Sequence, residues 1–286
     1  MDWQTQPKPA WLKRRYSQDP NQDMVEGILD GLSLNTVCRE ALCPNYRECF
    51  SRKTATFLIL GKNCTRNCPF CNITHAPPQP VDPEEPGRVA RAALGLGLRY
   101  AVITSVTRDD LADGGAAHFA AVIRAIRGLC PETAVEVLIP DFQGEESSLE
   151  RVSEAAPSVI SHNMETVKAL YPQVRPQADY RRSLRVIKKI GGLGGGIRSK
   201  SGIMLGLGET REQVYELFED LRAAGCSILT IGQYLSPSRE HYPVKEYIRP
   251  EVFEEYKEQA LSAGFDFVAS APFVRSSYHA GEALGL

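Results

Sequence analysis

The sequence predicts an α/β fold in which six β-strands alternate with six α-helices. Short apolar segments of four to six residues recur from Ala55 onward, and segments with helical periodicity separate them. Proline and glycine mark segment ends, as Pro83 and Pro86 do before a helix expected over 87–97 and Gly95 does near its end. With 286 residues, the chain suits one large domain with extensions. This alternation is typical of a parallel sheet with crossover helices.

The elements are expected in the following order. Residues 1–35 form an arm with a short helical pattern from Gln22 to Leu32, and residues 36–53 form an irregular loop because Pro44 prevents a regular helix. The chain is thus expected to have three parts: the arm with its cysteine-bearing loop (1–53), an α/β domain (54–265) and a C-terminal tail (266–286). Strands are expected at 57–61, 100–104, 135–139, 158–161, 202–205 and 228–231, and helices at 87–97, 115–128, 147–155, 179–190, 210–224 and 250–263.

Composition argues against nucleic acid and membrane as partners. The formal net charge is −2 and 24% of the residues are charged, so no global electrostatic attraction to a polyanion is expected. No apolar segment approaches the roughly 20 residues that a membrane-spanning helix needs. The N-terminus lacks the apolar core of a secretory signal, so a reducing cytoplasm is the expected location. Lys13, Arg14 and Arg15 are expected to form a solvated basic face.

Six of the eight cysteines fall into two triplets between residues 38 and 71. The first triplet has the spacing C-x4-C-x5-C and comprises Cys38, Cys43 and Cys49. The second has the spacing C-x3-C-x2-C and comprises Cys64, Cys68 and Cys71. Iron–sulfur clusters are usually held by four cysteine thiolates, so three thiolates leave one iron with an open position or a foreign ligand. Such an iron can bind a substrate or cofactor directly.

Two simpler interpretations of the cysteines remain open. His75 lies four residues after Cys71 and could complete a Cys3His zinc site. Disulfides are disfavoured because tightly clustered cysteines in an enzyme-sized chain without a secretion signal indicate metal binding or catalysis. Cys130 and Cys226 fall outside the triplets and are interpreted as packing cysteines.

The C-x3-C-x2-C spacing resembles that of the radical S-adenosylmethionine superfamily. Both triplets, with the tail motif Arg275-Ser276-Ser277-Tyr278, resemble the lipoyl synthase family from about Trp11 to the C-terminus. The resemblance implies that the six strand–helix units form a partial (β/α)6 barrel of the TIM type, with a cluster-binding N-terminal extension and a C-terminal tail. The active site of such barrels lies at the carboxyl ends of the strands. The second triplet already follows the first predicted strand.

The resemblance also implies two [4Fe-4S] clusters, and S-adenosylmethionine bound at the open iron of the second triplet. A serine of the tail motif, best matched by Ser277, would complete the cluster on the first triplet. Serine oxygen is a harder ligand than thiolate, so its iron would be displaced more easily. The residues expected near S-adenosylmethionine lie at strand ends and in the segment after the fourth strand: Thr104, Ser105, Asn163, Glu165, Arg175, Gly206 and Gln233.

The activity implied by the resemblance is insertion of two sulfur atoms at C6 and C8 of a protein-bound octanoyl-lysine, which gives the lipoyl group. The target C–H bonds are unactivated, so a cofactor-borne radical is needed and no side chain has to act as an acid or base. The cluster on the first triplet would be the sulfur source. Implied partners are octanoylated lipoyl domains of 2-oxoacid dehydrogenase acyltransferase subunits or the glycine-cleavage H protein, and a flavodoxin or ferredoxin. The alternatives are a biotin-synthase-like or tRNA-methylthiolating enzyme of the same superfamily and a zinc-stabilised binding protein.

Overall fold

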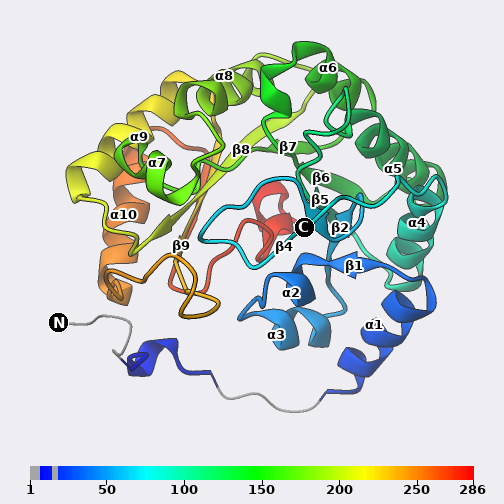
Figure 1. Cartoon of the computed structure of the whole chain (residues 1–286), viewed down its shortest axis with the longest axis horizontal. Helices are drawn as coiled ribbons and strands as arrows, with labels where there is room; N and C mark the ends of the chain where they lie inside the picture. The colour runs from blue at the N-terminus through cyan, green and yellow to red at the C-terminus, as the bar shows by residue number, and fades with distance from the viewer. Residues whose placement is uncertain (1–6, 15–18) are drawn as a thin grey trace.

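A curved sheet surrounded by helices forms the body of the protein (Figure 1). The computed structural model describes residues 7–14 and 19–286. The sheet has the strand order β1-β2-β5-β6-β7-β8-β9-β10, in which β1 runs antiparallel to β2 and every other neighbouring pair is parallel. Its strands are β1 (Asn35–Thr36), β2 (Thr56–Ile59), β5 (Tyr100–Ser105), β6 (Ala134–Leu138), β7 (Val159–Ser161), β8 (Arg198–Leu205), β9 (Ile228–Gln233) and β10 (Phe267–Ser270).

Helices cover the outer face of the sheet and the α/β prediction is confirmed. Each predicted strand–helix unit is present, with the helices between successive strands as a parallel sheet requires. The long helices are α1 (Pro20–Gly31), α4 (Glu85–Gly95), α5 (Ala116–Leu129), α6 (Glu146–Glu154), α8 (Tyr180–Gly191), α9 (Arg211–Ala223) and α10 (Pro250–Ser262). Short elements are α2 (Val37–Glu40), α3 (Tyr46–Ser51), α7 (Tyr171–Val174), the strands β3 (Asn63–Cys64) and β4 (Thr74–His75), and the 3-10 turns η2 (Ala10–Leu12), η3 (Phe142–Gly144), η4 (Lys168–Leu170) and η5 (Ala280–Leu284).

The core lies between the outer face of the sheet and these helices. Strand β2 is buried along its whole length, which explains why its sequence is a continuous apolar run rather than an alternating one. Helix α9 begins with a capping box, in which the Thr210 hydroxyl accepts from the Gln213 amide and the Gln213 side chain accepts from the Thr210 amide. Within the described residues, no helix has both the length and the apolar character needed to cross a bilayer.

Three features differ from the sequence-based expectation. A seventh parallel strand, β10, occupies the start of the segment expected to be a tail, and it pairs with β9 from Phe267 to Ser270. Strand β8 begins at Arg198, four residues before the predicted start. Its first residues are polar although most are buried, so they do not form the apolar run that predicts a strand. Residues 36–53 are not the irregular loop that was expected, because they form α2 and α3; as predicted, no regular helix runs through Pro44, which lies between the two.

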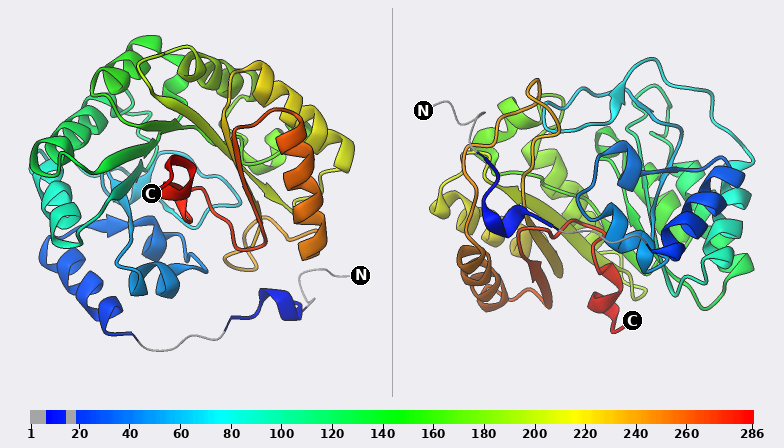
Figure 2. Two further views of the ribbon diagram at one scale, coloured as in Figure 1. Left: turned by 180° about the vertical axis from the view of Figure 1, so that it is seen from behind. Right: turned by 90° about the horizontal axis from the view of Figure 1, so that it is seen from below.

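The sheet is not closed by pairing between β1 and β10, and the C-terminus lies near the centre of the ring of strands (Figure 1). The tail runs inward from β10, and η5 packs where the strands begin: Ala283 contacts Val159 and Ile228, and Arg198 Nη1 donates to the Ala283 carbonyl at 2.6 Å. In the side view of Figure 2, this red segment lies at the opposite end of the barrel from the cyan segment with the second cysteine triplet.

Candidate active site

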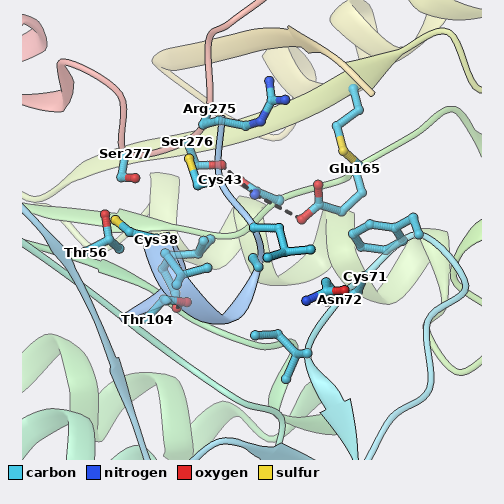
Figure 3. A pocket seen from close by; sticks show the side chains of 18 of the residues that line it. Cys38, Cys43, Thr56, Cys71, Asn72, Thr104, Glu165, Arg275, Ser276 and Ser277 are labelled. Atoms are coloured by element: carbon cyan, nitrogen blue, oxygen red, sulfur yellow. Dashed lines mark hydrogen bonds between the residues drawn. The ribbon is translucent and has the colours of Figure 1, made fainter. Parts of the chain in front are cut away.

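A cavity of about 730 Å³ lies at the carboxyl ends of the strands and contains both cysteine triplets (Figure 3). It is lined by segments from the whole length of the chain, including the arm, α2 and α3, the loops after β2, β5, β6 and β7, and the C-terminal tail. Its cysteines are Cys38, Cys43, Cys49, Cys64, Cys68 and Cys71. The fold therefore brings all six thiols to one space: the second triplet lies at the strand ends, where a barrel site was predicted, and the first triplet joins it from the N-terminal extension.

The first triplet is held by two short helices and the turn between them. Cys38 lies on α2, Cys49 lies on α3, and Cys43 lies between them, where its amide donates to the Cys38 carbonyl at 3.2 Å. Burial and, to a smaller extent, the negative charge of Cys43 together raise the pKa of the Cys38 and Cys49 thiols to about 12. Three thiolates near one another, one of them buried and two partly buried, need a compensating positive charge. A bound iron cluster would supply that charge, so the donor set fits one.

The second triplet lies on β3 and the loop that follows it. The Cys64 sulfur accepts hydrogen bonds from the amides of Arg66 at 3.4 Å and Thr107 at 3.3 Å. Burial raises the pKa of Cys71 to about 12 and also raises the pKa of Cys68. Amide donors directed at a sulfur stabilise its thiolate and tune the potential of a cluster bound there. This set also fits an iron–sulfur cluster.

Arg66 fixes the loop of the second triplet to the neighbouring strand ends. Its guanidinium forms two hydrogen bonds with Asp109, at 2.7 and 3.0 Å, and a third with Asp141 at 2.6 Å. Burial alone would lower the pKa of Arg66, but the two carboxylates raise it instead. On the same loop, the Thr65 hydroxyl donates to the Thr107 carbonyl at 3.0 Å. Cys64 and Cys68 are therefore carried by a loop that ionic contacts fix to the ends of the adjacent strands β5 and β6.

The geometry around His75 differs from that of a zinc site. His75 Nδ1 lies 3.2 Å from the Cys64 carbonyl oxygen, and the residue is exposed. In the part of the chain that the structure describes, no three His, Cys, Asp or Glu side chains converge closely enough to hold a single metal ion. Of the remaining cysteines, Cys226 is fully buried and Cys130 is partly buried.

Polar side chains line the same cavity as the two triplets, and two of their atoms are unpaired. Thr104, Ser105, Asn163, Glu165 and Arg175, all expected near S-adenosylmethionine, line the cavity. The Ser105 hydroxyl and the Asn163 Oδ1 atom are buried and have no hydrogen-bond partner within the described chain. Buried polar atoms are rarely left unpaired, so these two fit a polar ligand bound in the cavity.

Glu165 and Arg175 form the charged part of this wall. Glu165 has a φ angle of 64°, in the left-handed region that few residues other than glycine adopt, and burial raises the pKa of its carboxyl group. Asn163 Nδ2 donates to it at 3.0 Å. Arg175 Nη1 donates to the Asn163 carbonyl at 2.8 Å and to the Tyr171 hydroxyl at 3.1 Å. Arg175 is therefore part of the cavity wall rather than a surface residue at the end of a helix.

Gly206 and Gln233 do not line the cavity. The Gln233 amide is fully buried and donates to three backbone carbonyls, while its oxygen accepts from the Ile248 amide at 2.8 Å. A side chain on Gly206 would collide with Gln233 and the Glu246 carbonyl. The Glu209 carboxylate accepts from the Gly206 amide at 2.6 Å. The segment from Gly206 to Glu209 therefore builds a tight turn beside the site, and Met204 and Tyr234 line the cavity instead.

Both serines of the tail motif line the cavity, and their surroundings differ (Figure 3). The Ser276 hydroxyl accepts a hydrogen bond from Asn163 Nδ2 at 2.7 Å. Ser277 lies toward Cys38 and Cys43 in Figure 3, and its hydroxyl has no hydrogen-bond partner among the described residues. Of the two serines, Ser277 is the one whose oxygen is free to bind a group held by the first triplet.

Comparison with known proteins places the chain among iron–sulfur enzymes. A family model described as the Radical SAM superfamily matches residues 58–221. A lipoyl synthase of Alkaliphilus metalliredigens (strain QYMF) is 57% identical over 277 residues, which cover 97% of this chain and 96% of that protein. A lipoyl synthase of Caldicellulosiruptor saccharolyticus is 58% identical over 275 residues, 96% of each chain. The chain belongs to the lipoyl synthase family.

Solved structures of other radical enzymes share the fold of this lipoyl synthase family member. Methylornithine synthase (PylB) superposes with a TM-score of 0.54 at 12% identity, covering 91% of this chain and 85% of that one. HydG, described as a maturase of the [FeFe]-hydrogenase, gives 0.54 at 13% identity, covering 95% and 65%. The predicted radical-enzyme fold is thus confirmed, and at these identities the likeness concerns the fold alone.

Two arginines of this lipoyl synthase family member acquire roles that the sequence did not indicate. Arg14 was expected on a solvated basic face, but it pairs with Glu48, stacks 3.9 Å from the Phe273 ring and lines the cavity. Arg15 lies outside the described residues. Arg66 is flanked by cysteines in the sequence, which was the one available signal of its position. Their acidic partners are remote in sequence, so no local pattern reveals either contact.

Proposed function

We propose that this protein inserts two sulfur atoms, at C6 and C8, into an octanoyl group carried on a lysine of another protein. One observation carries the proposal: two separate cysteine triplets, each fitted to an iron–sulfur cluster, line one cavity. A single triplet would suffice for radical formation, whereas a second cluster in the same space could supply sulfur. Unactivated C–H bonds require radical chemistry, for which acids and bases are insufficient.

Cys64, Cys68 and Cys71 would hold the cluster that binds S-adenosylmethionine. When bound, the cluster and S-adenosylmethionine together would supply the radical chemistry. The chain's own part is to bind and orient. The free Asn163 oxygen and Ser105 hydroxyl could bind polar groups of the cofactor. Arg175 keeps the Asn163 backbone in place through its 2.8 Å hydrogen bond. None of these residues needs to transfer a proton.

Cys38, Cys43, Cys49 and Ser277 would hold a second [4Fe-4S] cluster, which is the proposed sulfur source. Apolar side chains from three adjacent strands, Leu58, Val102 and Leu138, also line the cavity. An acyl chain could lie against these residues with water excluded, at a favourable free energy of about 0.8 kcal/mol per buried methylene. The proposed acceptors are octanoylated lipoyl domains of acyltransferase subunits or the glycine-cleavage H protein, with a flavodoxin or ferredoxin as electron donor.

Two triple variants test the assignment of the clusters. Parent protein reconstituted without air should contain about eight irons per chain, and replacement of either triplet by alanine should leave about four. The variant lacking the second triplet should neither cleave S-adenosylmethionine nor form product from an octanoylated lipoyl-domain peptide. The variant lacking the first triplet, Cys38, Cys43 and Cys49, should still form 5′-deoxyadenosine and insert no sulfur.

Cys130→Ala is the matched control, because Cys130 lies outside both triplets, and it should retain full iron content and activity. Full iron content in either triple variant would contradict the two-cluster assignment. Lipoyl product from the variant without the first triplet would remove that cluster from the sulfur-donor role.

A further inference from the structure

The tail segment around Ser277 is hydrogen-bonded on both sides of that residue. On one side, Ser276 is bound to Asn163 at 2.7 Å, in the part of the cavity that contains Glu165. On the other side, the Tyr278 hydroxyl donates to Glu48 at 2.8 Å. Ser277 lies between these two contacts and its own hydroxyl is unpaired within the described chain. The chain thus fixes both neighbours of Ser277 and leaves the Ser277 hydroxyl itself free.

The contact on the side of Tyr278 belongs to a wider interface between the tail and α3, the helix that carries Cys49. Asn45, immediately before α3, donates through Nδ2 to the Phe273 carbonyl at 2.7 Å. Glu48 accepts from Tyr278 and pairs with Arg14, so this carboxylate is bound from two sides. Because Glu48 precedes Cys49 directly, the hydrogen bond fixes the tail relative to a thiol of the first triplet.

The contact on the side of Ser276 depends on two glycines that leave room for the tail. A side chain on Gly202 would lie 2.6 Å from the Thr230 hydroxyl, 2.9 Å from Asn163 Oδ1 and 3.1 Å from the Ser276 hydroxyl. Gly202 therefore leaves room for Ser276 beside Asn163. A side chain on Gly232 would likewise collide with the Val274 carbonyl, so β9 admits the tail backbone only because glycine stands there.

We propose that Ser276 and Tyr278 are positioning residues that hold the Ser277 oxygen at the first cysteine triplet. The proposal rests on the proposed function, in which Ser277 is the fourth ligand of the second cluster. A serine ligand on an untethered tail would have to order that tail each time it bound iron, at a cost of about 1–2 kcal/mol per residue. The two side-chain hydrogen bonds order the segment before iron binds. Through Asn163, the Ser276 contact also joins the tail to the wall expected to bind S-adenosylmethionine.

The test is the release of iron from the second cluster, measured in full-length chain whose Cys64, Cys68 and Cys71 are all alanine, so that one cluster remains. With a chelator in excess, Ser277→Ala should release one iron fast. Tyr278→Phe should release that iron roughly tenfold to a hundredfold faster than the parent, the loss expected for a hydrogen bond to a charged group. Ser276→Ala should accelerate it about fivefold, as for a neutral pair. Tyr247→Phe, which removes a hydroxyl remote from the tail, should match the parent.

A double-substitution cycle distinguishes positioning from general destabilisation. Glu48→Ala and Tyr278→Phe should each accelerate release, and their combination should be no faster than Glu48→Ala alone, because Tyr278 has no Glu48 contact left to lose once the carboxylate is gone. In cluster-free protein, both should lower hydrogen-exchange protection of residues 273–284 while other amides keep theirs. Hydrogen exchange therefore tests the positioning role even in a variant that fails to assemble a cluster.

Parental iron release and parental exchange in Tyr278→Phe and Ser276→Ala, together with fast release in Ser277→Ala, would overturn the positioning role and leave the proposed cluster intact. Parental release in Ser277→Ala would overturn both the serine ligand and this inference. Failure of the parent to assemble a second cluster would instead contradict the proposed function. These three outcomes are distinct in the same set of measurements.

Discussion

Replacement of Arg66 by alanine should destabilise the loop that carries Cys64 and Cys68. The Arg66 side chain is 5% exposed, and its guanidinium joins two carboxylates from the strand ends after β5 and β6. One of them, Asp141, is fully buried, and its closest remaining cation would be Arg182 at 3.3 Å. The substitution therefore leaves a buried carboxylate with an incomplete set of partners.

The expected loss follows from that burial. Removing one partner of a buried ion pair costs about 3–5 kcal/mol, because the remaining charge stays desolvated. For a chain of this size, such a loss lowers the unfolding temperature by roughly 10 °C. Arg66→Lys should recover part of it, since an ammonium group keeps the charge but lacks the fork that binds Asp109 at 2.7 and 3.0 Å.

Thermal unfolding of cluster-free protein, followed by circular dichroism, measures this loss without the clusters. Arg211→Ala is the control, because its pair with Glu255 is half-exposed on both sides and its removal should leave the unfolding temperature nearly unchanged. After reconstitution, Arg66→Ala should hold less iron than the parent. An unfolding temperature for Arg66→Ala equal to that of the control would refute the reasoning.

Two further predictions concern buried ionisable side chains that the proposed chemistry does not use. Lys200→Met should lower the free energy of unfolding in urea by about 3–5 kcal/mol, because Lys200 and Glu136 are each 1% exposed and pair at 2.8 Å. Adding Glu136→Gln should restore most of the lost stability. A double variant as unstable as the single one would contradict the ion-pair argument. Burial lowers the pKa of His162 from 6.5 to about 4, so the unfolded chain binds the proton more readily and the parent should lose up to about 3 kcal/mol of stability as the pH falls through that window. His162→Gln should flatten this part of the curve of unfolding free energy against pH, and identical slopes in both proteins would disprove the assignment.

The order of strands and helices was predictable because burial imposes a period on the sequence. Strand β2 is buried along its whole length, and its apolar residues Phe57–Ile59 continue into Leu60, whereas β10 is a shorter apolar run that is buried only at alternate positions, with Phe267 and Ala269 partly exposed. The missed start of β8 has a similar cause: Lys200 is buried, but its charge is neutralised by Glu136 from a distant strand. Strand prediction from hydrophobicity fails where an ion pair replaces an apolar contact.

The site was predictable where one short motif contains its own chemistry. Cysteine spacing indicated both triplets, and the strand ends gave Ser105 and Asn163, which the fold brings to the cavity. Contacts between remote segments were not predictable. Arg66 and Asp141 are 75 residues apart, and no periodicity relates them. Gln233 lies at a strand end as expected, yet its side-chain amide is fully hydrogen-bonded to backbone groups of β8 and of the segment around Glu246 and Ile248. Only the folded chain reveals these contacts.

The interface between the tail and α3 has a consequence for synthesis of the chain. Asn45 and Phe273 are 228 residues apart, and Glu48 and Tyr278 are 230 apart. At about 5–20 residues per second, a ribosome needs roughly 10–50 s to make the tail after the first triplet has emerged. During that interval Cys38, Cys43 and Cys49 lack the segment that later encloses them, and they are accessible to oxidants, to metals and to any protein that delivers iron and sulfur. Translation of the tail segment therefore determines when this period of exposure ends.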